Sequence, residues 1–367
     1  MQLNYTEIWT WNKKILYDVE VFHYCKIEIE NIGSENNYHF YFLNRNQLIP
    51  LFKHNILNNI SYKTLVQTYQ KSKDLQDYYE EILLLCKKEN ITHIIFTGTG
   101  QYWHPDFLKK LKENWIIISL STADDDTNKI KKYSLPYTKY YDFHFHVWVM
   151  YNRDWTTIAE KLREWWWNPV WIPLGARADH INEKVDFENR DIEVCYIWNI
   201  NPCKLFRLAK LKRYFGDRFK LYGLQGNGDW KSLKWIFYKV MNKLFGLWYI
   251  EPVSDEKHKE IYGRTKIGFN MHLVSWKWPS NSRLYELPCN WVMQVCDNEL
   301  GLKMVFEIWK EIVAYKNIHD AIKKIEYYLK NDKERIKIAK AWYKRAMANY
   351  LYQDVFITMF DIIFGLK

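Results

Sequence analysis

The sequence predicts an α/β protein made of two doubly wound, parallel sheets. Apolar runs of four to six residues alternate with helical stretches, and such runs are typical of parallel strands that are buried on both faces. A polar segment at residues 182–190 interrupts this pattern, which then starts again. With 367 residues, the chain is long enough for two domains that each bury a core of their own.

The first half of the chain sets up the first sheet. Apolar runs predict strands at 14–21, 38–43, 91–97, 115–120, 143–150 and 169–173. Apolar residues at helical spacing predict helices at 65–88, 105–113 and 156–165. The segment 173–179, which contains Pro173 and Gly175, and the polar residues after it are interpreted as a linker.

The second half repeats the alternation. Strands are predicted at 193–197, 219–222, 266–269, 292–295 and 312–314. Helices are predicted at 203–214, 230–243, 254–263, 281–287, 320–330, 332–350 and 351–364. Ligands of such sheets bind beyond the carboxyl ends of the strands, so polar residues at those ends are the first candidates for a site.

The composition excludes several classes of protein. The 48% hydrophobic and 26% charged residues are typical of a globular chain, and no apolar run is long enough to cross a bilayer. The N-terminus does not resemble a secretory signal, and the six Cys have no C-x-x-C spacing, which favours reduced, buried thiols in a cytoplasmic protein. The net charge of +10 fits solvated helix faces, an anionic membrane surface or, less well, nucleic acid.

The segment 279–295 carries the most specific pattern. Arg283 and Glu286 are three residues apart, so they share one face of the helix predicted there, and a short apolar strand follows. This order resembles the C-terminal, nucleotide-sugar-binding half of GT-B glycosyltransferases, specifically the spore-maturation type within the group 1 families. In that family an Arg and a Glu at this spacing precede a small-residue turn and a strand. The resemblance is firm over about residues 190–350 and loose before them.

The resemblance implies a GT-B fold, in which two Rossmann-like domains face each other across a cleft. Residues 1–175 would form the acceptor-side domain, 190–350 the nucleotide-sugar-binding domain, and 351–367 a terminal helix that crosses back to the first domain. The implied activity is transfer of a sugar from a nucleotide-diphosphate donor to an acceptor hydroxyl, with retention and without a metal. No cofactor is expected beyond the donor, which acts as co-substrate.

Arg283 and Glu286 are the central donor-binding candidates. A planar guanidinium pairs two phosphate oxygens at once and keeps its charge, which suits Arg283 for the diphosphate. The resemblance implies that Glu286 takes the ribose hydroxyls. Related retaining enzymes often carry a further glutamate eight positions earlier, where this chain has Trp278. The alternative for the pair is an ordinary surface ion pair.

Further donor-binding candidates follow the strands of the second half. They are Asn199, Tyr222, Gly223, Asn270, Asn281 and Ser282. Asn281 and Ser282 begin a predicted helix, so they are equally well explained as helix caps. Free backbone amides at that helix start would also favour a bound phosphate.

The first half offers weaker catalytic candidates. Asp125 lies in an Asp-Asp-Asp turn after a predicted strand, where the resembling family has an aspartate-rich turn that faces the acceptor. A solvated loop or a helix cap explains this turn as well. His146 alternates with His144 on one strand, so the two imidazoles share a face, as a catalytic pair or as buried structural residues. No clear metal-binding pattern accompanies them, so no metal site is predicted.

The predicted partners are a nucleotide-sugar donor and a glycan, lipid or protein acceptor. The predicted location is the cytoplasm, with peripheral membrane contact through the basic surface as an added possibility. Two alternatives from other classes stay open. One is a basic nucleic-acid-binding or DNA-modifying protein, and the other is a sugar-binding module without catalysis.

The chain has 19 Trp but only 13 Gly, where average usage would give about 26 Gly. Several Trp stand where chain geometry or the resembling family asks for glycine. These are Trp115, Trp148, at least one of Trp165, Trp166 and Trp167, Trp198, Trp248, Trp278, Trp291, Trp309 and Trp342. We interpret them as UGA codons that the source decodes as glycine, in keeping with a Lys-, Asn- and Ile-rich, AT-rich gene. The alternative is a genuinely Trp-rich protein whose indoles stack on sugars.

Overall fold

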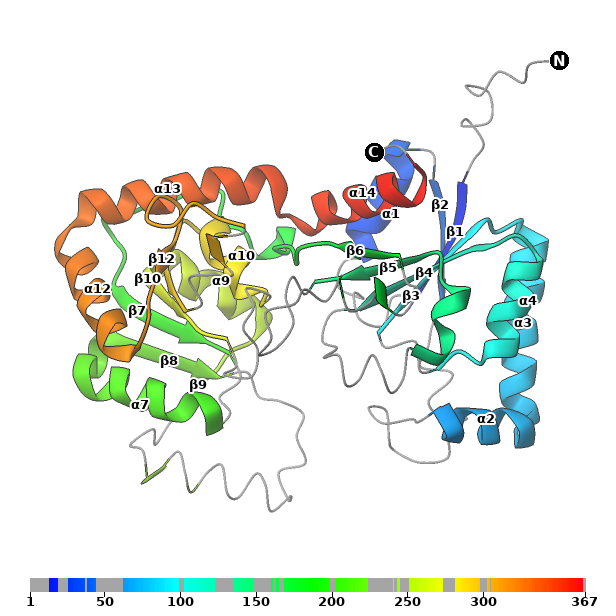
Figure 1. Ribbon diagram of the computed structural model, residues 1–367. Helices are drawn as coiled ribbons and strands as arrows, with labels where there is room; N and C mark the ends of the chain where they lie inside the picture. The colour runs from blue at the N-terminus through cyan, green and yellow to red at the C-terminus, as the bar shows by residue number, and fades with distance from the viewer. Residues whose placement is uncertain are drawn as a thin grey trace. The chain divides into compact units, whose positions relative to one another are not determined.

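The computed structural model describes residues 13–18, 26–36, 38–43, 62–98, 102–122, 135–147, 160, 163–164, 168–198, 202–223, 240, 243–244, 251–272, 281–297, 302–303 and 305–365. The chain divides into two compact units (Figure 1). The first unit combines Met1–Pro173 with Phe356–Lys367, and the second is the continuous stretch Leu174–Val355. Within the described ranges, no helix is both long enough and apolar enough to cross a membrane.

The first unit is built on a six-stranded parallel sheet with the order β2-β1-β3-β4-β5-β6. Its strands are β1 (Lys13–Asp18), β2 (Tyr38–Leu43), β3 (His93–Thr97), β4 (Ile117–Thr122), β5 (Phe143–His146) and β6 (Pro169–Trp171). The central strand β3 is buried along its whole length, as expected for a strand covered on both faces.

Helices and a C-terminal segment cover this sheet. They are α1 (Lys26–Asn36), α2 (Tyr62–Lys71), α3 (Lys73–Glu89), α4 (Pro105–Glu113), the 3₁₀ turn η6 (Leu135–Tyr140) and the end of α14 (Tyr352–Ile363). Tyr79 of α3 stacks on Phe107 of α4 with ring centroids 4.6 Å apart. From the other end of the chain, Phe360 packs on Phe40 with centroids 5.2 Å apart. The first core is therefore completed by residues more than three hundred positions away from its first strand.

The second unit has its own six-stranded parallel sheet, with the order β12-β11-β10-β7-β8-β9. The strands are β7 (Ile192–Ile197), β8 (Phe219–Gly223), β9 (Glu251–Pro252), β10 (Thr265–Asn270), β11 (Met293–Cys296) and β12 (Val313–Ala314). The chain moves outward from β7 to β9, then returns to β10 on the other side of β7 and continues to β12. The pair β7 and β10 is thus the point where the strand order reverses, which is where open α/β sheets bind ligands.

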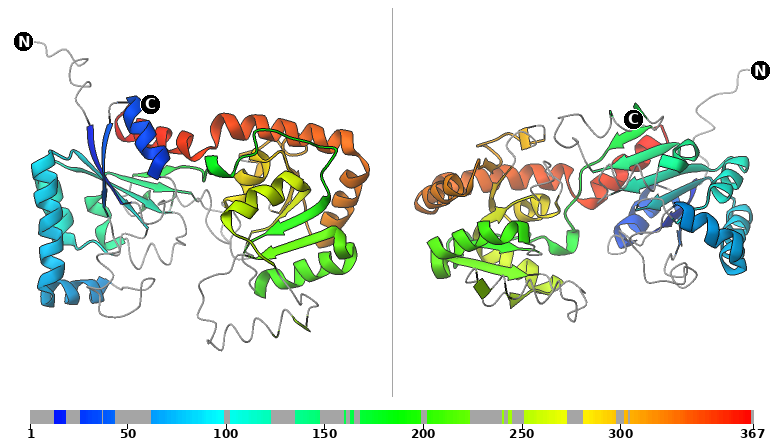
Figure 2. Two further views of the ribbon diagram at one scale, coloured as in Figure 1. Left: turned by 180° about the vertical axis from the view of Figure 1, so that it is seen from behind. Right: turned by 60° about the horizontal axis from the view of Figure 1, so that its bottom comes forward.

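Helices cover both faces of the second sheet (Figures 1 and 2). They are α7 (Pro202–Phe215), α9 (Asp255–Arg264), α10 (Arg283–Cys289), α12 (Ile318–Lys330) and α13 (Asp332–Asn349), with short 3₁₀ turns η7 (Ala178–His180) and η8 (Gly216–Arg218). One cluster joins Val194 and Tyr196 of β7 to α7 and α12, and another joins Cys195 and Ile197 to α9 and α10. Alternate residues of β7 therefore serve opposite cores.

Gly268 sets how closely α10 approaches the sheet. A Cβ built on Gly268 of β10 would lie 2.5 Å from Cδ2 and 2.7 Å from Cδ1 of Leu287, whose side chain is buried. Real Cβ atoms do not come this close to another carbon, so a larger residue at this position would force the buried Leu287 side chain or α10 itself to move. Because residue 268 has no side chain, the helix that carries Arg283 and Glu286 packs closely on the sheet.

We expect Gly268→Ala to lower the free energy of unfolding by about 1–3 kcal/mol, because the added methyl overpacks the contact with Leu287. Urea denaturation followed by circular dichroism measures the loss. Gly216→Ala is the control, since nothing lies within 4 Å of a Cβ there and its cost comes only from a φ of +57°. When Leu287 is already changed to Ala, adding Gly268→Ala should lower the free energy of unfolding by less than it does in the unchanged protein, because the clashing carbons are gone. An equal loss in both backgrounds would contradict the proposed clash.

Two local differences from the sequence prediction have clear causes. The helix predicted at 65–88 is two helices, because Ser72 adopts an extended backbone and its hydroxyl accepts a hydrogen bond from the Leu75 amide (3.3 Å), so that it caps α3. Helix α1 was missed because Lys26–Asn36 begins with Lys-Ile-Glu-Ile-Glu, an alternation that is typical of a strand. Most of the helices predicted at 230–243 and at 156–165 lie outside the described residues.

Left-handed backbone occurs at four non-glycine residues of the described ranges, and three of them are Trp. The φ angles are 54° at Asn90, 60° at Trp115, 59° at Trp291 and 71° at Trp309. Bulky L-residues rarely adopt this conformation, whereas glycine adopts it readily. Trp342 differs from these three, because it lies inside α13 with its indole fully buried.

Trp115 and Trp291 occupy the same position at the end of a helix. After α4, the Trp115 amide donates to Lys112 O (3.0 Å) and the Ile116 amide to Leu111 O (3.2 Å). After α10, the Trp291 amide donates to Pro288 O (2.9 Å) and the Val292 amide to Leu287 O (3.1 Å). This pair of hydrogen bonds defines the Schellman motif, whose left-handed residue is usually glycine.

Candidate donor site at the carboxyl edge of the second sheet

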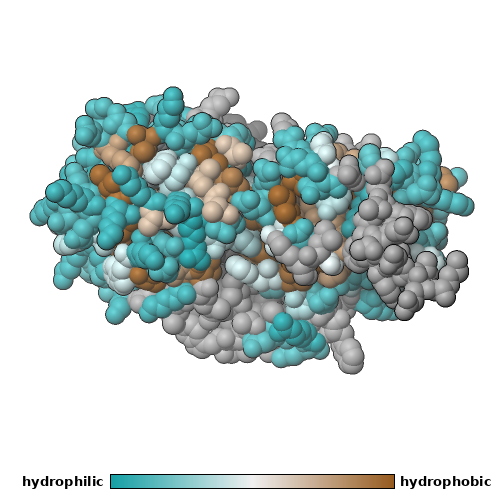
Figure 3. Space-filling model, turned by 90° about the horizontal axis from the view of Figure 1, so that it is seen from above, coloured by the Kyte–Doolittle hydropathy of each residue, from teal (hydrophilic) through white to brown (hydrophobic). Residues whose placement is uncertain are grey.

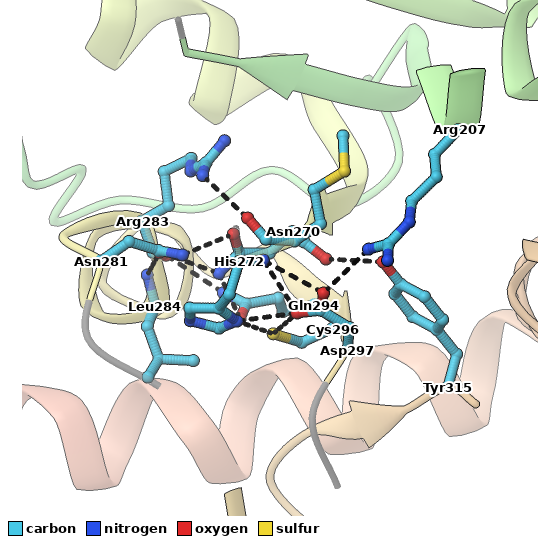
Figure 4. A network of polar contacts seen from close by, with 11 residues as sticks. Arg207, Asn270, His272, Asn281, Arg283, Leu284, Gln294, Cys296, Asp297 and Tyr315 are labelled. Carbon is cyan, nitrogen blue, oxygen red and sulfur yellow. Dashed lines mark hydrogen bonds and ion pairs between the residues drawn. The ribbon is translucent and has the colours of Figure 1, made fainter. Parts of the chain in front are cut away.

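The polar residues predicted around α10 form one connected network at the carboxyl edge of the second sheet (Figure 4). Asn270, the last residue of β10, and Asn281 exchange two amide hydrogen bonds of 3.0 Å each. Asn270 Nδ2 also donates to Gln294 Oε1 (3.3 Å), and Gln294 Nε2 donates to the backbone oxygen of Arg283 (3.0 Å). Strands β10 and β11 are thereby tied to the start of α10.

Asn281 and Ser282 begin the helix in different ways. Asn281 Oδ1 accepts a hydrogen bond from the Leu284 amide (3.1 Å), so this side chain caps the first turn as well as pairing with Asn270. The Ser282 side chain makes no capping bond. Its hydroxyl oxygen is buried and has no hydrogen-bond partner among the described residues. Asn281 therefore fits the capping alternative, and Ser282 does not.

Arg283 lies where the strand order reverses. Its Nη1 donates to Ile197 O at the end of β7 (3.4 Å), and its Nη2 donates to Met271 O just after β10 (3.3 Å). Its Nε is buried and has no hydrogen-bond partner among the described residues. A buried cation with an unused donor at this edge is a suitable group for binding an anion.

Two aromatic rings flank the Arg283 guanidinium. Its central carbon lies 4.7 Å from the Tyr196 ring centroid and 5.3 Å from that of Trp198. Burial alone lowers the pKa of Arg283, but Tyr196, Tyr262 and Glu286 outweigh this and raise it, so the group stays charged. Trp198 covers a face of the guanidinium, which is 1% exposed.

Glu286 lies one helical turn after Arg283 and is 5% exposed. Its charge contributes, after burial, to raising the pKa of the Tyr262 phenol well above its usual value. Its backbone oxygen accepts a hydrogen bond from Asn290 Nδ2 (2.9 Å). Because Arg283 and Glu286 are both buried, they are not the ordinary surface ion pair that was the alternative.

Tyr222 and Gly223 end β8, next to β7 in the same sheet. The Trp198 amide donates to Tyr222 O (3.2 Å), so the residue after β7 is fixed against the end of β8. Both residues are partly exposed. They lie along the same carboxyl edge as Asn270, while Asn199 lies outside the described residues.

A second group at this edge was not predicted from the sequence. His272 Nδ1 lies 2.7 Å from Asp297 Oδ1, and the His272 backbone amide donates to the same carboxylate (2.9 Å). Arg207 of α7 donates to Asp297 Oδ2 (3.2 Å). His272 follows Asn270 by two positions and Asp297 directly follows β11, so the rule that selected Asn270 would have found both (Figure 4).

His272, Cys296 and Asp297 offer ligand atoms within 4.8 Å of one another, which raises the question of a metal ion. The donor set does not fit one. The Asp297 carboxylate is already engaged by His272 and by the Arg207 cation. These groups are better explained as a set of polar contacts around Asp297 that stabilises the carboxyl edge of the sheet.

The catalytic candidates of the first half lie in the other unit. His146 ends β5 and is fully buried, with its ring centroid 5.9 Å from that of His144. Burial and the neighbouring His146 lower the pKa of His144 well below its usual value. Both imidazoles thus belong to the interior of the first sheet. Asp125 lies outside the described residues.

The chain is similar to known proteins in part of its sequence and in its fold. Residues 204–361 match the model of a family described as glycosyl transferase-like. A search of curated proteins found no match. Among solved structures, a sucrose-phosphate synthase from Thermosynechococcus elongatus is similar with a TM-score of 0.67 and 11% identity, over 96% of this chain and 99% of that one.

Two further similar structures were solved with nucleotides bound. An α-glucosyltransferase in complex with UDP and a 13-mer DNA has a TM-score of 0.62 and 12% identity, over 96% of this chain and 100% of that one. The Anabaena protein HepE, in complex with UDP and glucose, has a TM-score of 0.59 and 8% identity, over 95% of this chain and 98% of that one.

Two parallel sheets of this topology, with these structural relatives, define the GT-B fold, so the predicted fold class is confirmed. The family match covers residues 204–361, less than half of the chain, and within this part the chain is similar to glycosyltransferases, as the resemblance predicted.

Proposed function

We propose that the protein transfers a hexose or related sugar from a nucleoside-diphosphate donor to an acceptor hydroxyl, and that the second unit binds the donor. The observation that carries this proposal is Arg283, a buried cation with an unused Nε donor at the β7–β10 reversal. A diphosphate is the anionic part of such a donor, and its oxygens match the guanidinium fork. UDP in the related structures makes uridine the first nucleotide to test.

The chemistry assigned to these residues is charge stabilisation. As the bond between the anomeric carbon and the diphosphate breaks, negative charge grows on the leaving oxygens. The positive charge of Arg283 stabilises this negative charge, so no metal ion is needed. Glu286, one turn further along α10, accepts hydrogen bonds from the ribose hydroxyls. The side chains of Asn270, Asn281 and Gln294 hold the start of α10 against β10 and β11. Arg283 and Glu286, which α10 carries, therefore need not reorganise during transfer.

Retention of configuration follows in this proposal from the leaving diphosphate itself. The acceptor hydroxyl approaches on the face that the diphosphate leaves, and a departing phosphate oxygen takes the hydroxyl proton as the new glycosidic bond forms. No side chain is required as a covalent nucleophile. The buried Cys residues of the second unit are unsuited to that role, because burial raises the thiol pKa of Cys195 to about 12 and that of Cys289 still further.

A second acceptor class is supported by one comparison. The related α-glucosyltransferase was solved with DNA, and the present chain carries a net charge of +10. DNA modification is therefore the alternative to a glycan, lipid or protein acceptor. It uses the same donor chemistry, so the donor and the acceptor can be tested separately.

The donor assignment is tested with UDP-, GDP- and dTDP-sugars, by calorimetric titration and by release of the free nucleotide. We expect saturable binding of at least one donor and slow hydrolysis of it without added metal, unchanged by EDTA. NMR of the sugar product reports its anomeric configuration. Binding of no nucleotide sugar by a folded protein would reject the proposal, and release that requires a divalent ion would reject its metal-independent form.

A further inference from the structure

A row of four lysines forms the solvent face of α13. They are Lys333, Lys337, Lys340 and Lys344, and all four are exposed. At 100° per residue their side chains fall within an arc of about 60°, and the row is about 16 Å long. Arg335, Ile338, Ala339, Trp342 and Ala346, which are the buried residues of the helix, lie on the opposite side. We call the four residues the lysine row.

The lysine row lacks acidic partners. Its steps of four, three and four residues bring like charges side by side on the helix, which is destabilising. None of the four ammonium groups has an ion pair within the described part of the chain, although Lys340 lies 5.7 Å from the Phe187 ring centroid. Two other basic residues of α12 and α13 do form ion pairs: Lys324 pairs with Asp320 (2.7 Å) and Arg345 with Glu311 (3.0 Å).

Apolar side chains border the row on one flank. Ile336 and Met347 are half-buried and lie at the same edge of the helix, next to Lys340. Figure 3 views the protein from above, so the side on which α13 lies in Figure 1 faces the viewer, and hydrophilic residues in teal gather there with fewer apolar ones. A straight, basic helix face with an apolar border has the character of an element that lies on a charged interface.

We propose that the lysine row binds the surface of a membrane that contains anionic phospholipids. Lysine ammonium groups on flexible stems suit many weak contacts to a plane of headgroups, and four to eight such residues on one helix are typical of anionic lipid binding. Nucleic acid fits this face less well, because its described residues include no exposed Arg and no groove. The proposal concerns binding to a membrane through α13, and it does not depend on the assignment of the donor site at α10.

The test measures co-sedimentation of the full chain with vesicles of phosphatidylglycerol and phosphatidylcholine, and with vesicles of phosphatidylcholine alone. We expect binding to the anionic vesicles only, and weakening as salt rises. Changing the lysine row to Gln should weaken binding on the order of tenfold or more. A matched variant with Lys71, Lys73, Lys87 and Lys88 changed to Gln has the same net charge and should bind like the unchanged protein.

Each other outcome overturns the proposal. Absence of binding to anionic vesicles, or equal loss in both variants, would mean that the row has no specific role. Loss of duplex-DNA binding in the lysine-row variant, with vesicle binding unchanged, would assign the row to nucleic acid. Both variants should stay folded, because all eight side chains are exposed. The melting temperature of the lysine-row variant should equal or exceed that of the unchanged protein, because the repulsion along α13 is removed.

A separate observation concerns the identity of three residues. Trp115, Trp291 and Trp309 have left-handed backbone, and the first two occupy the glycine position of a Schellman motif. We infer that the source organism inserts glycine at these three positions, through UGA codons read as glycine. Peptide mass spectrometry of the protein purified from that organism tests this. Gly is expected at 115, 291 and 309, with Trp at position 103, where the indole is buried and stacked on Phe96. Trp at the three positions would reject the inference.

Discussion

Glu286→Ala is expected to weaken donor binding by about ten- to a hundredfold. A carboxylate that accepts hydrogen bonds from two ribose hydroxyls contributes about 1.5–3 kcal/mol, and the truncated side chain leaves those hydroxyls without partners. Calorimetric titration with UDP and with UDP-glucose measures the change. Because UDP lacks the sugar but keeps the ribose, both ligands should lose similar amounts of binding free energy.

The matched control for this prediction is Glu311→Ala. Glu311 is also a buried glutamate of the second unit, 6% exposed and paired with Arg345. Both variants should lose stability, but only Glu286→Ala should lose the donor. Glu286→Gln, which keeps the shape and one acceptor oxygen, should fall between them. If Glu286→Ala binds as tightly as the unchanged protein, Glu286 does not hold the ribose.

The triple variant Trp115→Gly/Trp291→Gly/Trp309→Gly is expected to be more stable than the unchanged protein, by less than the about 3–6 kcal/mol that three left-handed L-residues cost together. Left-handed backbone costs an L-residue about 1–2 kcal/mol, and glycine avoids this cost. The gain should be cleanest at Trp115, whose side chain is 92% exposed and has little packing to lose. At Trp291 a stacking contact with Tyr343 and a hydrogen bond to Asn182 O (3.1 Å) offset part of the gain.

Urea denaturation of the recombinant proteins measures this difference. Trp171→Gly is the control, since Trp171 is an exposed Trp in β6 without a left-handed backbone, and glycine should lower stability there. Lower stability of the triple variant would show that the three indoles contribute more than the strain costs.

The sequence predicted the repeating elements well because their signals are local. The helix Pro105–Glu113 and the strand Tyr38–Leu43 have the predicted bounds, since His104 and Pro105 start the helix and the aromatic run defines the strand. The strand order of the second sheet was not predicted from the sequence and comes from the structure. Helix α1 was missed because its sequence alternates like a strand, and only its packing in the first core selects the helix.

The candidate site was predictable in part. Arg283 and Glu286 share a helix, so their spacing alone brought them together. The contact of Asp297 with Arg207 joins residues ninety positions apart, and the sequence gives no signal of that pairing. Burial of Arg283 against Tyr196 was also beyond reach, because it depends on how closely Gly268 lets α10 approach the sheet. The assignments of individual donor-binding residues stay predictions.

The discontinuous first unit has a consequence for biosynthesis. The C-terminal residues Phe356, Phe360 and Phe364 pack on residues of the first three strands, which are Tyr17, Phe40 and His93. The first core is therefore completed only after the last residues of the chain have been synthesised. The second unit ends at Val355, directly before Phe356, so the whole of it is synthesised before the segment that completes the first core. While residues 174–355 are being synthesised, the aromatic face of the first half that contacts Phe356, Phe360 and Phe364 stays uncovered.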